Sequence, residues 1–240
     1  AAKEAYGLIS NLPEGGYVKL GKFLVPYGLG LSDDNSLVRL PLEAAFSFDG
    51  PTPDGVEVGL APSPLFLSAA LVNGASNPGS GSVAGYDEKA FSARGGLNFP
   101  EWTLGGSVYG ENLDLDNGRL RYGTYGWVRM GPAVFLGELD AGWDALGTGL
   151  PLPPAGWTDY LATHASVEFD MGGSVYLRLT DEWLDDSRRL NPHDGLRNMV
   201  SLRCYPVGNL KLQVDLARMD PVLAVNDPDY SLVADAFVFY

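Results

Sequence analysis

A histidine and a serine that could act together in covalent chemistry stand two positions apart, at His164 and Ser166. Side chains two residues apart in a β-strand point to the same face, and a histidine beside a serine can be the base that activates a nucleophile. The sequence therefore offers one Ser–His pair for acyl transfer. The alternative interpretation is two polar residues that line the interior of a β-structure.

Charged side chains at alternate positions offer a second kind of chemistry, that of an ion pathway. If the apolar side chains between them face outward, the charged ones share an interior. The candidate pore-lining residues are Arg94, Arg121, Arg129, Glu138, Asp140, His164, Glu168, Arg178, Glu182, Arg203, Lys211 and Asp215. Arginines beside acids would set up a field across a water-filled pore, whereas in a plugged interior the same charges would simply pair. Excess acid in the lumen would favour cations weakly, whereas a phosphate site needs clustered Lys and Arg.

The composition narrows the classes of partner and cofactor. The 240 residues include 16 basic and 30 acidic side chains, for a formal net charge of −14, and 45% are hydrophobic. Such an acidic chain is a poor ligand for phosphate backbones, so we expect no nucleic-acid partner. One cysteine and two histidines exclude a disulfide framework and a Cys/His zinc site. Since there is also no C-x-x-C-H motif for haem attachment, we expect neither metal nor cofactor.

One segment, residues 112–118, has the alternating oxygen side chains that calcium loops use. It lacks the bidentate glutamate of a complete calcium loop. Its Asn–Gly ending instead favours a solvated hairpin loop.

Apolar and polar residues alternate from one end of the chain to the other, and no convincing helical periodicity competes with this pattern. The runs match the roughly 9–11 residues that a tilted strand needs to cross a bilayer. The predicted strands are 4–11, 15–25, 37–48, 55–61, 65–73, 88–99, 102–112, 119–130, 133–144, 158–170, 174–184, 197–206, 209–219 and 231–240. We therefore predict an all-β fold, a single closed antiparallel transmembrane β-barrel of about 12–14 strands that spans residues 1–240.

Short and long connections take turns along the chain, which is typical of a transmembrane barrel with tight periplasmic turns and larger outer loops. Aromatic residues such as Trp102, Trp143 and Trp183 stand at the ends of apolar faces, where amphipathic rings meet the headgroups. The alternative is a soluble barrel or sandwich. Charge recurs at mid-strand on the opposite face, however, and a small soluble barrel fills its interior with apolar side chains.

The count of predicted strands conflicts with this alternation of short and long connections near the N-terminus. With the strands counted back from the C-terminus, the turn near residues 12–16 falls on the long-loop side and residues 26–36 fall on the short-turn side, which reverses the rule. Either residues 24–36 fold into the lumen, or the first element is no barrel strand, or a preceding region is missing.

Two segments resemble known families. The chain end has apolar residues at alternate positions before an aromatic last residue, and it resembles the C-terminal assembly signal of Gram-negative outer-membrane barrels; its residues are Leu232, Ala234, Ala236, Val238 and Tyr240. The segment GKFLVPYGL, residues 21–29, resembles the G-[K/R]-F-x-x-P-[F/Y]-G-L segment of phosphate-selective-type porins and of the porin-like barrels of porin–cytochrome conduits.

These resemblances imply the outer membrane of a Gram-negative bacterium, with surrounding lipid and the barrel assembly machinery as partners. The porin resemblance implies a passive channel for small hydrophilic solutes or ions, not an enzyme, with a homo-oligomer as one arrangement. The conduit resemblance implies instead a structural sleeve or anchor for a multihaem c-type cytochrome.

A third resemblance concerns catalysis. His164-Ala165-Ser166 is similar to the His-x-Ser pair of outer-membrane acyl hydrolases, which implies a lipid acyl hydrolase. Val167 stands where that family has asparagine. Alternation also turns the pair toward the lumen, while those enzymes act at the lipid-facing surface.

Overall fold

The computed structural model describes residues 5–29, 53–73, 89–111, 119–144, 160–186, 195–208, 210–221 and 228–238. These residues form thirteen β-strands and a short 3-10 helix, η1 (Pro13–Gly15). The strands are β1 (Ala5–Leu12), β2 (Gly16–Lys22), β3 (Asp54–Leu60), β4 (Leu65–Asn73), β5 (Lys89–Phe99), β6 (Trp102–Glu111), β7 (Arg119–Met130), β8 (Ala133–Asp144), β9 (Tyr160–Gly172), β10 (Val175–Asp186), β11 (Gly195–Val207), β12 (Leu210–Pro221) and β13 (Asp229–Val238). The predicted all-β class is confirmed.

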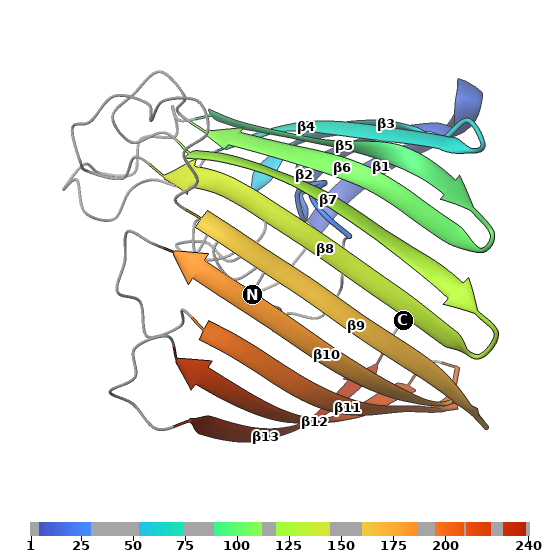
Figure 1. Cartoon of the computed structure of the whole chain (residues 1–240). Helices are drawn as coiled ribbons and strands as arrows, with labels where there is room; N and C mark the ends of the chain where they lie inside the picture. Colours follow the sequence, from blue (N-terminus) through green and yellow to red (C-terminus); the bar gives the residue numbers. More distant parts are fainter. Residues whose placement is uncertain are drawn as a thin grey trace.

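One antiparallel sheet contains all thirteen strands, and each strand pairs with the next in the chain. The sheet curls strongly from β1 to β13, so that it forms the wall of a barrel (Figure 1). Each strand from β5 to β12 has ten to thirteen residues, which suits tilted membrane-crossing strands. The predicted antiparallel barrel architecture of about 12–14 strands is confirmed.

The connections obey a strict alternation. Those that follow odd-numbered strands are short, as at Pro13–Gly15 between β1 and β2, and those that follow even-numbered strands are long, as at residues 23–53 between β2 and β3. The short turns lie together at the right-hand end of the barrel in Figure 1. We call this the short-turn end and the opposite one the long-connection end.

The parity difficulty of the sequence is resolved by the pairing of β2 with β3, in which Tyr17 lies opposite Gly59 and Lys22 opposite Asp54. The turn near residues 12–16 therefore belongs to the short-turn end, where the rule requires it. The strand predicted at 37–48, which created the conflict, lies outside the described residues. β1 pairs with β2, so the interpretation that the first element is no barrel strand is wrong.

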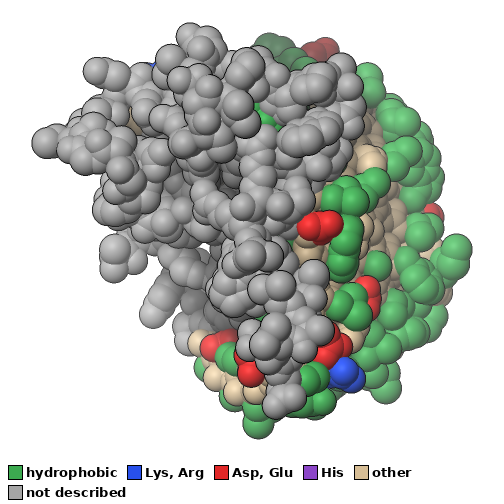
Figure 2. Space-filling view, turned by 60° about the vertical axis from the view of Figure 1, so that its left-hand side comes forward, with side chains coloured by type: hydrophobic (Ala, Val, Ile, Leu, Met, Phe, Trp, Pro, Cys, Tyr) green, Lys and Arg blue, Asp and Glu red, His purple; other side chains and the backbone are tan. Residues whose placement is uncertain are grey.

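The two faces of the sheet are inverted relative to a soluble protein. Large apolar side chains such as Leu67, Leu104 and Leu139 are exposed on the outer face, while carboxylates and arginines are buried on the inner face. Figure 2 shows hydrophobic side chains gathered over the outer surface of the wall. This distribution suits strands whose outer face meets lipid and whose inner face surrounds a polar lumen.

Candidate functional site

The lumen contains a stretch of the chain itself, residues 23–29, which we call the lumen segment. It follows β2 directly, and Phe23, Val25 and Tyr27 are buried in a cluster with inner-face side chains of β4–β6, including Val72 and Tyr109. Of the alternatives for the N-terminal region, this placement of residues 24–29 corresponds to the one in which residues 24–36 fold into the lumen, and residues 30–36 lie outside the described residues.

Polar contacts hold the lumen segment against β5. The Ser92 hydroxyl donates to the carbonyl oxygen of Pro26 at 2.8 Å, and Arg94 Nη1 donates to the carbonyl oxygen of Gly28 at 3.3 Å. Beyond the end of a strand, backbone carbonyl oxygens lose the donors of the neighbouring strand and need other hydrogen-bond partners such as these. One side of the segment is therefore fixed to a single strand.

The other side of the lumen segment reaches β8. The Tyr27 hydroxyl donates to Asp140 Oδ1 at 2.9 Å, and the Leu29 amide donates to Glu138 Oε2 at 3.2 Å. Both carboxylates are buried, with Asp140 only 1% exposed. Because β5 and β8 are separated by two strands in the sheet, the segment bridges the inner face and narrows the lumen at this level.

Gly28 is the residue that lets the segment lie so close to β8. Its φ is +60°, in the left-handed region that favours glycine. A Cβ at this position would also collide with the Glu138 carboxylate. The glycine of the Pro-Tyr-Gly sequence is therefore required by both backbone conformation and space.

A second polar cluster lies farther around the wall, on β9, β10 and β11. His164 and Glu182 are directly opposite each other on adjacent strands, and His164 Nδ1 lies 2.7 Å from Glu182 Oε1. Arg197 Nε donates to the other oxygen of Glu182 at 2.7 Å. Glu182 thus carries two charge-assisted contacts while it is 1% exposed.

The same cluster places a serine on the histidine. His164 Nε2 lies 3.2 Å from Ser166 Oγ, so Ser166, His164 and Glu182 form a nucleophile–base–acid sequence of the kind used in acyl transfer. Arg178 Nη2 also donates to Ser166 Oγ at 3.2 Å. The pair faces the inner side of the sheet, as alternation predicted.

The predicted pore-lining residues mostly lie buried on the inner face. Buried are Arg121, Glu138, Asp140, His164, Arg178, Glu182, Arg203, Lys211 and Asp215. Arg94 and Glu168 are half-buried. Arg129 is exposed, because it lies beside the turn at the short-turn end of β7. Arg203 donates to Glu168 at 3.1 Å, so the charges on this part of the wall are paired.

Several inner-face residues were not among the candidates. Tyr27 has the same hydrogen-bonding role as the strand residues but lies in an irregular segment, where periodicity says nothing. Arg197 stands at the same phase as Met199, Ser201 and Arg203, so period-two alternation carried back to residue 197 would have found it. Glu57 of β3, which alternation does turn toward the lumen, is buried and accepts a hydrogen bond from Lys19 of β2 at 3.0 Å.

The predicted assembly signal lies on the last strand. Leu232, Ala234 and Ala236 are exposed on β13. The side chain of Val238 and all of Tyr240 lie outside the described residues. The signal therefore stays a prediction.

Metal binding has no support in the described residues, where no three His, Cys, Asp or Glu side chains gather as a metal site would require. The oxygen-rich segment 112–118 lies outside them. Among the described residues we also find no helix whose length and apolarity would let it cross a membrane.

Comparison with known proteins identifies the fold. No family model and no curated protein matches the chain. The anion-selective porin from Comamonas acidovorans aligns with a TM-score of 0.62 at 11% identity, over 99% of this chain and 78% of its own. A porin refined at 1.8 Å resolution gives 0.56 at 14% identity, over 93% and 78%. A variant of the Rh. blastica porin gives 0.53 at 13% identity, over 94% and 74%. The chain therefore has a porin-like antiparallel β-barrel fold.

Proposed function

We propose that the protein is an outer-membrane channel for passive diffusion of small hydrophilic solutes or ions, with the lumen segment as its constriction. The observation that carries the proposal is the set of hydrogen bonds between residues 23–29 and four inner-face side chains, Ser92, Arg94, Glu138 and Asp140. A narrowed, charge-lined passage inside an apolar outer wall is what a selective pore needs.

Charge at the constriction sets the direction of selectivity. Glu138 and Asp140 stand together on β8, and Arg94 is turned onto the carbonyl oxygen of Gly28. Two carboxylates face the single guanidinium of Arg94 at the constriction, and this excess of acid favours cations weakly. We propose a Gram-negative outer-membrane location, with the short turns in the periplasm and insertion by the barrel assembly machinery through the last strand. We propose a homo-oligomer as the assembled state.

Conductance in planar lipid bilayers tests the channel. We expect discrete openings and a small reversal potential of cation-selective sign in a salt gradient. Tyr27→Phe removes the hydrogen bond to Asp140, worth about 1 kcal/mol, and should give larger or longer openings. Tyr125→Phe is the matched control, because the Tyr125 hydroxyl is buried and has no hydrogen-bond partner among the described residues. A purified, folded protein that never opens would exclude the channel.

A structural sleeve for a multihaem cytochrome is the alternative that the conduit resemblance implies. The lumen segment occupies space that a protein partner inside the barrel would need. Co-purification with a haem protein that survives salt washing would favour the sleeve over the open channel.

The Ser166–His164–Glu182 arrangement favours an acyl hydrolase as a second candidate. Nucleophilic attack would need Ser166 Oγ to give up its contact with Arg178 and a substrate to enter the lumen. A fluorophosphonate probe measures the nucleophilic reactivity of Ser166 directly. Labelling of the folded chain that is lost in Ser166→Ala but kept in Ser201→Ala, a buried inner-face serine on β11, would support the enzyme. The channel proposal expects no labelling.

A further inference from the structure

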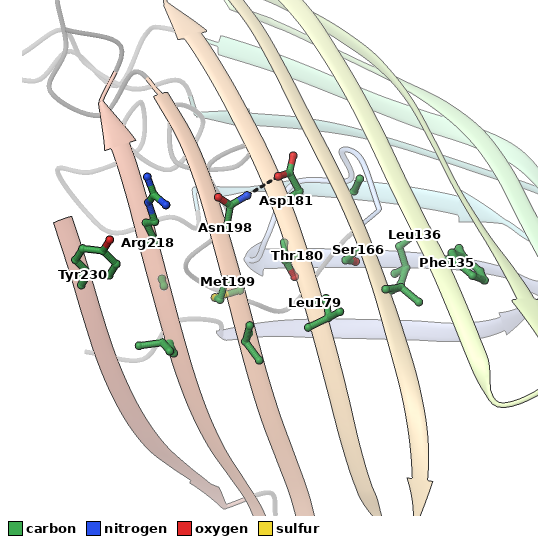
Figure 3. A pocket seen from close by; sticks show the side chains of 15 residues that line it. Phe135, Leu136, Ser166, Leu179, Thr180, Asp181, Asn198, Met199, Arg218 and Tyr230 are labelled. Carbon is green, nitrogen blue, oxygen red and sulfur yellow. Dashed lines mark hydrogen bonds between the residues drawn. The ribbon is translucent and has the colours of Figure 1, made fainter. Parts of the chain in front are cut away.

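A polar row crosses the outer face of the sheet at β10–β13. Tyr230 lies opposite Arg218, Arg218 opposite Asn198, and Asn198 opposite Asp181. Asp181, Arg218 and Tyr230 are exposed, and Asn198 donates to Asp181 at 2.5 Å (Figure 3). Charged side chains on a lipid-facing surface destabilise a barrel. The presence of Asp181 and Arg218 on this face therefore indicates a functional site.

The row continues into a groove. Asp181 lies opposite Ala165, and Ala165 lies opposite Gly137, so the row ends in small residues on β9 and β8. The neighbouring row is apolar throughout, with Leu216, Val200, Leu179, Val167 and Phe135 paired in turn. Together they line an open groove of about 600 Å³ (Figure 3). That volume is within the roughly 300–1,000 Å³ of small-molecule sites.

The groove has a polar end and an apolar end. Tyr230 is the second residue of β13, and Arg218 is near the last residue of β12, so both lie toward the long-connection end. Phe135 is the third residue of β8, next to a short turn. An amphiphile that lies along the groove would therefore place its head group at the polar row and its chain toward the short-turn end.

We propose that this groove binds one zwitterionic aminophospholipid, of the phosphatidylethanolamine type. One acyl chain lies over Ala165 toward Phe135, the phosphate is bound by Arg218 and the Tyr230 hydroxyl, and the ammonium group is bound by Asp181. The proposal concerns the outer wall and does not depend on conduction through the lumen, although it requires that these strands face lipid.

Charge complementarity selects the head group. Arg218 is 50% exposed and contacts Asp220 Oδ1 through Nη2 at 2.9 Å. A guanidinium has five N–H donors, so Arg218 can bind a phosphate in addition to Asp220. With Asp181 included, the three charged side chains are net negative. A head group with an amine is therefore favoured over a purely anionic one.

Native mass spectrometry of the full chain, refolded in detergent micelles with equal amounts of phosphatidylethanolamine and phosphatidylglycerol, tests the site. We expect one retained phosphatidylethanolamine per chain. Ala165→Phe fills the groove without a change of charge and should reduce this occupancy about tenfold, equivalent to about 1.4 kcal/mol. The matched control is Ala69→Phe on β4, another exposed alanine of the outer face, which should leave occupancy unchanged.

The head-group contacts are tested separately. Asp181→Asn should abolish the preference for phosphatidylethanolamine over phosphatidylglycerol, while Arg218→Gln should weaken both. Every variant is first shown to be folded by the faster migration of unboiled protein on a gel. Equal retention of the two lipids by the wild type, preferred retention of lipid A, or equal effects of Ala165→Phe and Ala69→Phe would overturn the proposal. Unchanged conductance of these variants separates this outcome from a failure of the channel.

Discussion

Gly28 occupies a position where substitution has two separate costs. Its positive φ disfavours any L-residue, by about 1–2 kcal/mol. A Cβ would also displace the Glu138 carboxylate, which accepts the hydrogen bond from the Leu29 amide. One missing side chain therefore couples the backbone of the lumen segment to the charge on β8.

Comparison of Gly28→Ala with Gly131→Ala separates these costs. Gly131 has a φ of +59°, but nothing lies within 4 Å of its would-be Cβ. Gly131→Ala should therefore lose only the conformational term of about 1–2 kcal/mol. Gly28→Ala should lower the urea midpoint of unfolding further and should also enlarge the openings in bilayers. Equal midpoints and unchanged openings would show that Gly28 does not hold the segment against Glu138.

Tyr27 marks the limit of what a single residue reveals in a sequence. Pro26 and Gly28 could be recognised as the signs of a redirected chain, and the fold-back into the lumen was one of the predicted alternatives. The partner of Tyr27, Asp140, lies 113 positions away. Periodicity assigns a face to a strand residue, but it does not say which residue of an irregular segment will meet it.

At the scale of elements, β9, β10 and β11 are coupled on the inner face through one residue of the middle strand. Glu182 on the middle strand contacts His164 on one neighbour and Arg197 on the other. The register brings these residues opposite one another. Cross-strand pairs are the unit of sheet stabilisation. We therefore expect this ladder of contacts, His164–Glu182–Arg197, to contribute more to the free energy of unfolding than exposed ion pairs do.

Loss of the central carboxylate tests that coupling. Glu182→Ala removes a carboxylate that is 1% exposed and is shared by His164 and Arg197, and it should cost about 3–5 kcal/mol. Glu168→Ala breaks a pair with Arg203 whose carboxylate side chain is 29% exposed, and it should cost about 0–1 kcal/mol. Urea unfolding that is monitored by tryptophan fluorescence measures the midpoints of both variants. Similar midpoints for the two variants would contradict the assignment of Glu182 as the centre of the ladder.

Strand positions were predictable because alternation is a local property with a period of two residues. It placed Arg121, Asp140 and Arg178 on the inner face, where they are buried. It also included Arg129 at the correct phase, but phase does not tell how far a residue lies from the end of a strand. The opposition of Glu182 to His164 depends on register across the turn near residue 173, which period alone does not determine.

At the scale of the whole molecule, the sequence predicted the class of fold and left its N-terminal arrangement open. A strand at 37–48 led to the reversed loop parity, and the described pairing of β2 with β3 restores it. Apolar alternation in residues 37–48 predicts a strand, but alternation does not tell which strands pair with one another. Pairing between β2 and β3 is a long-range choice that no local pattern specifies.

The described residues form an odd number of strands, and this has a consequence for the way the polypeptide traverses a membrane. In an antiparallel sheet of thirteen strands paired in chain order, β1 and β13 run in the same direction. The start of β1 lies at the long-connection end, and the end of β13 lies at the short-turn end. With the short turns in the periplasm, as proposed above, the long-connection end faces the cell exterior. A peptide tag fused before β1 should therefore be labelled on intact cells by a reagent that cannot cross the membrane. The same tag placed after β13 should be reached only once the outer membrane is permeabilised, so the two ends of one barrel would report on opposite compartments; equal labelling of both tags on intact cells would contradict this topology.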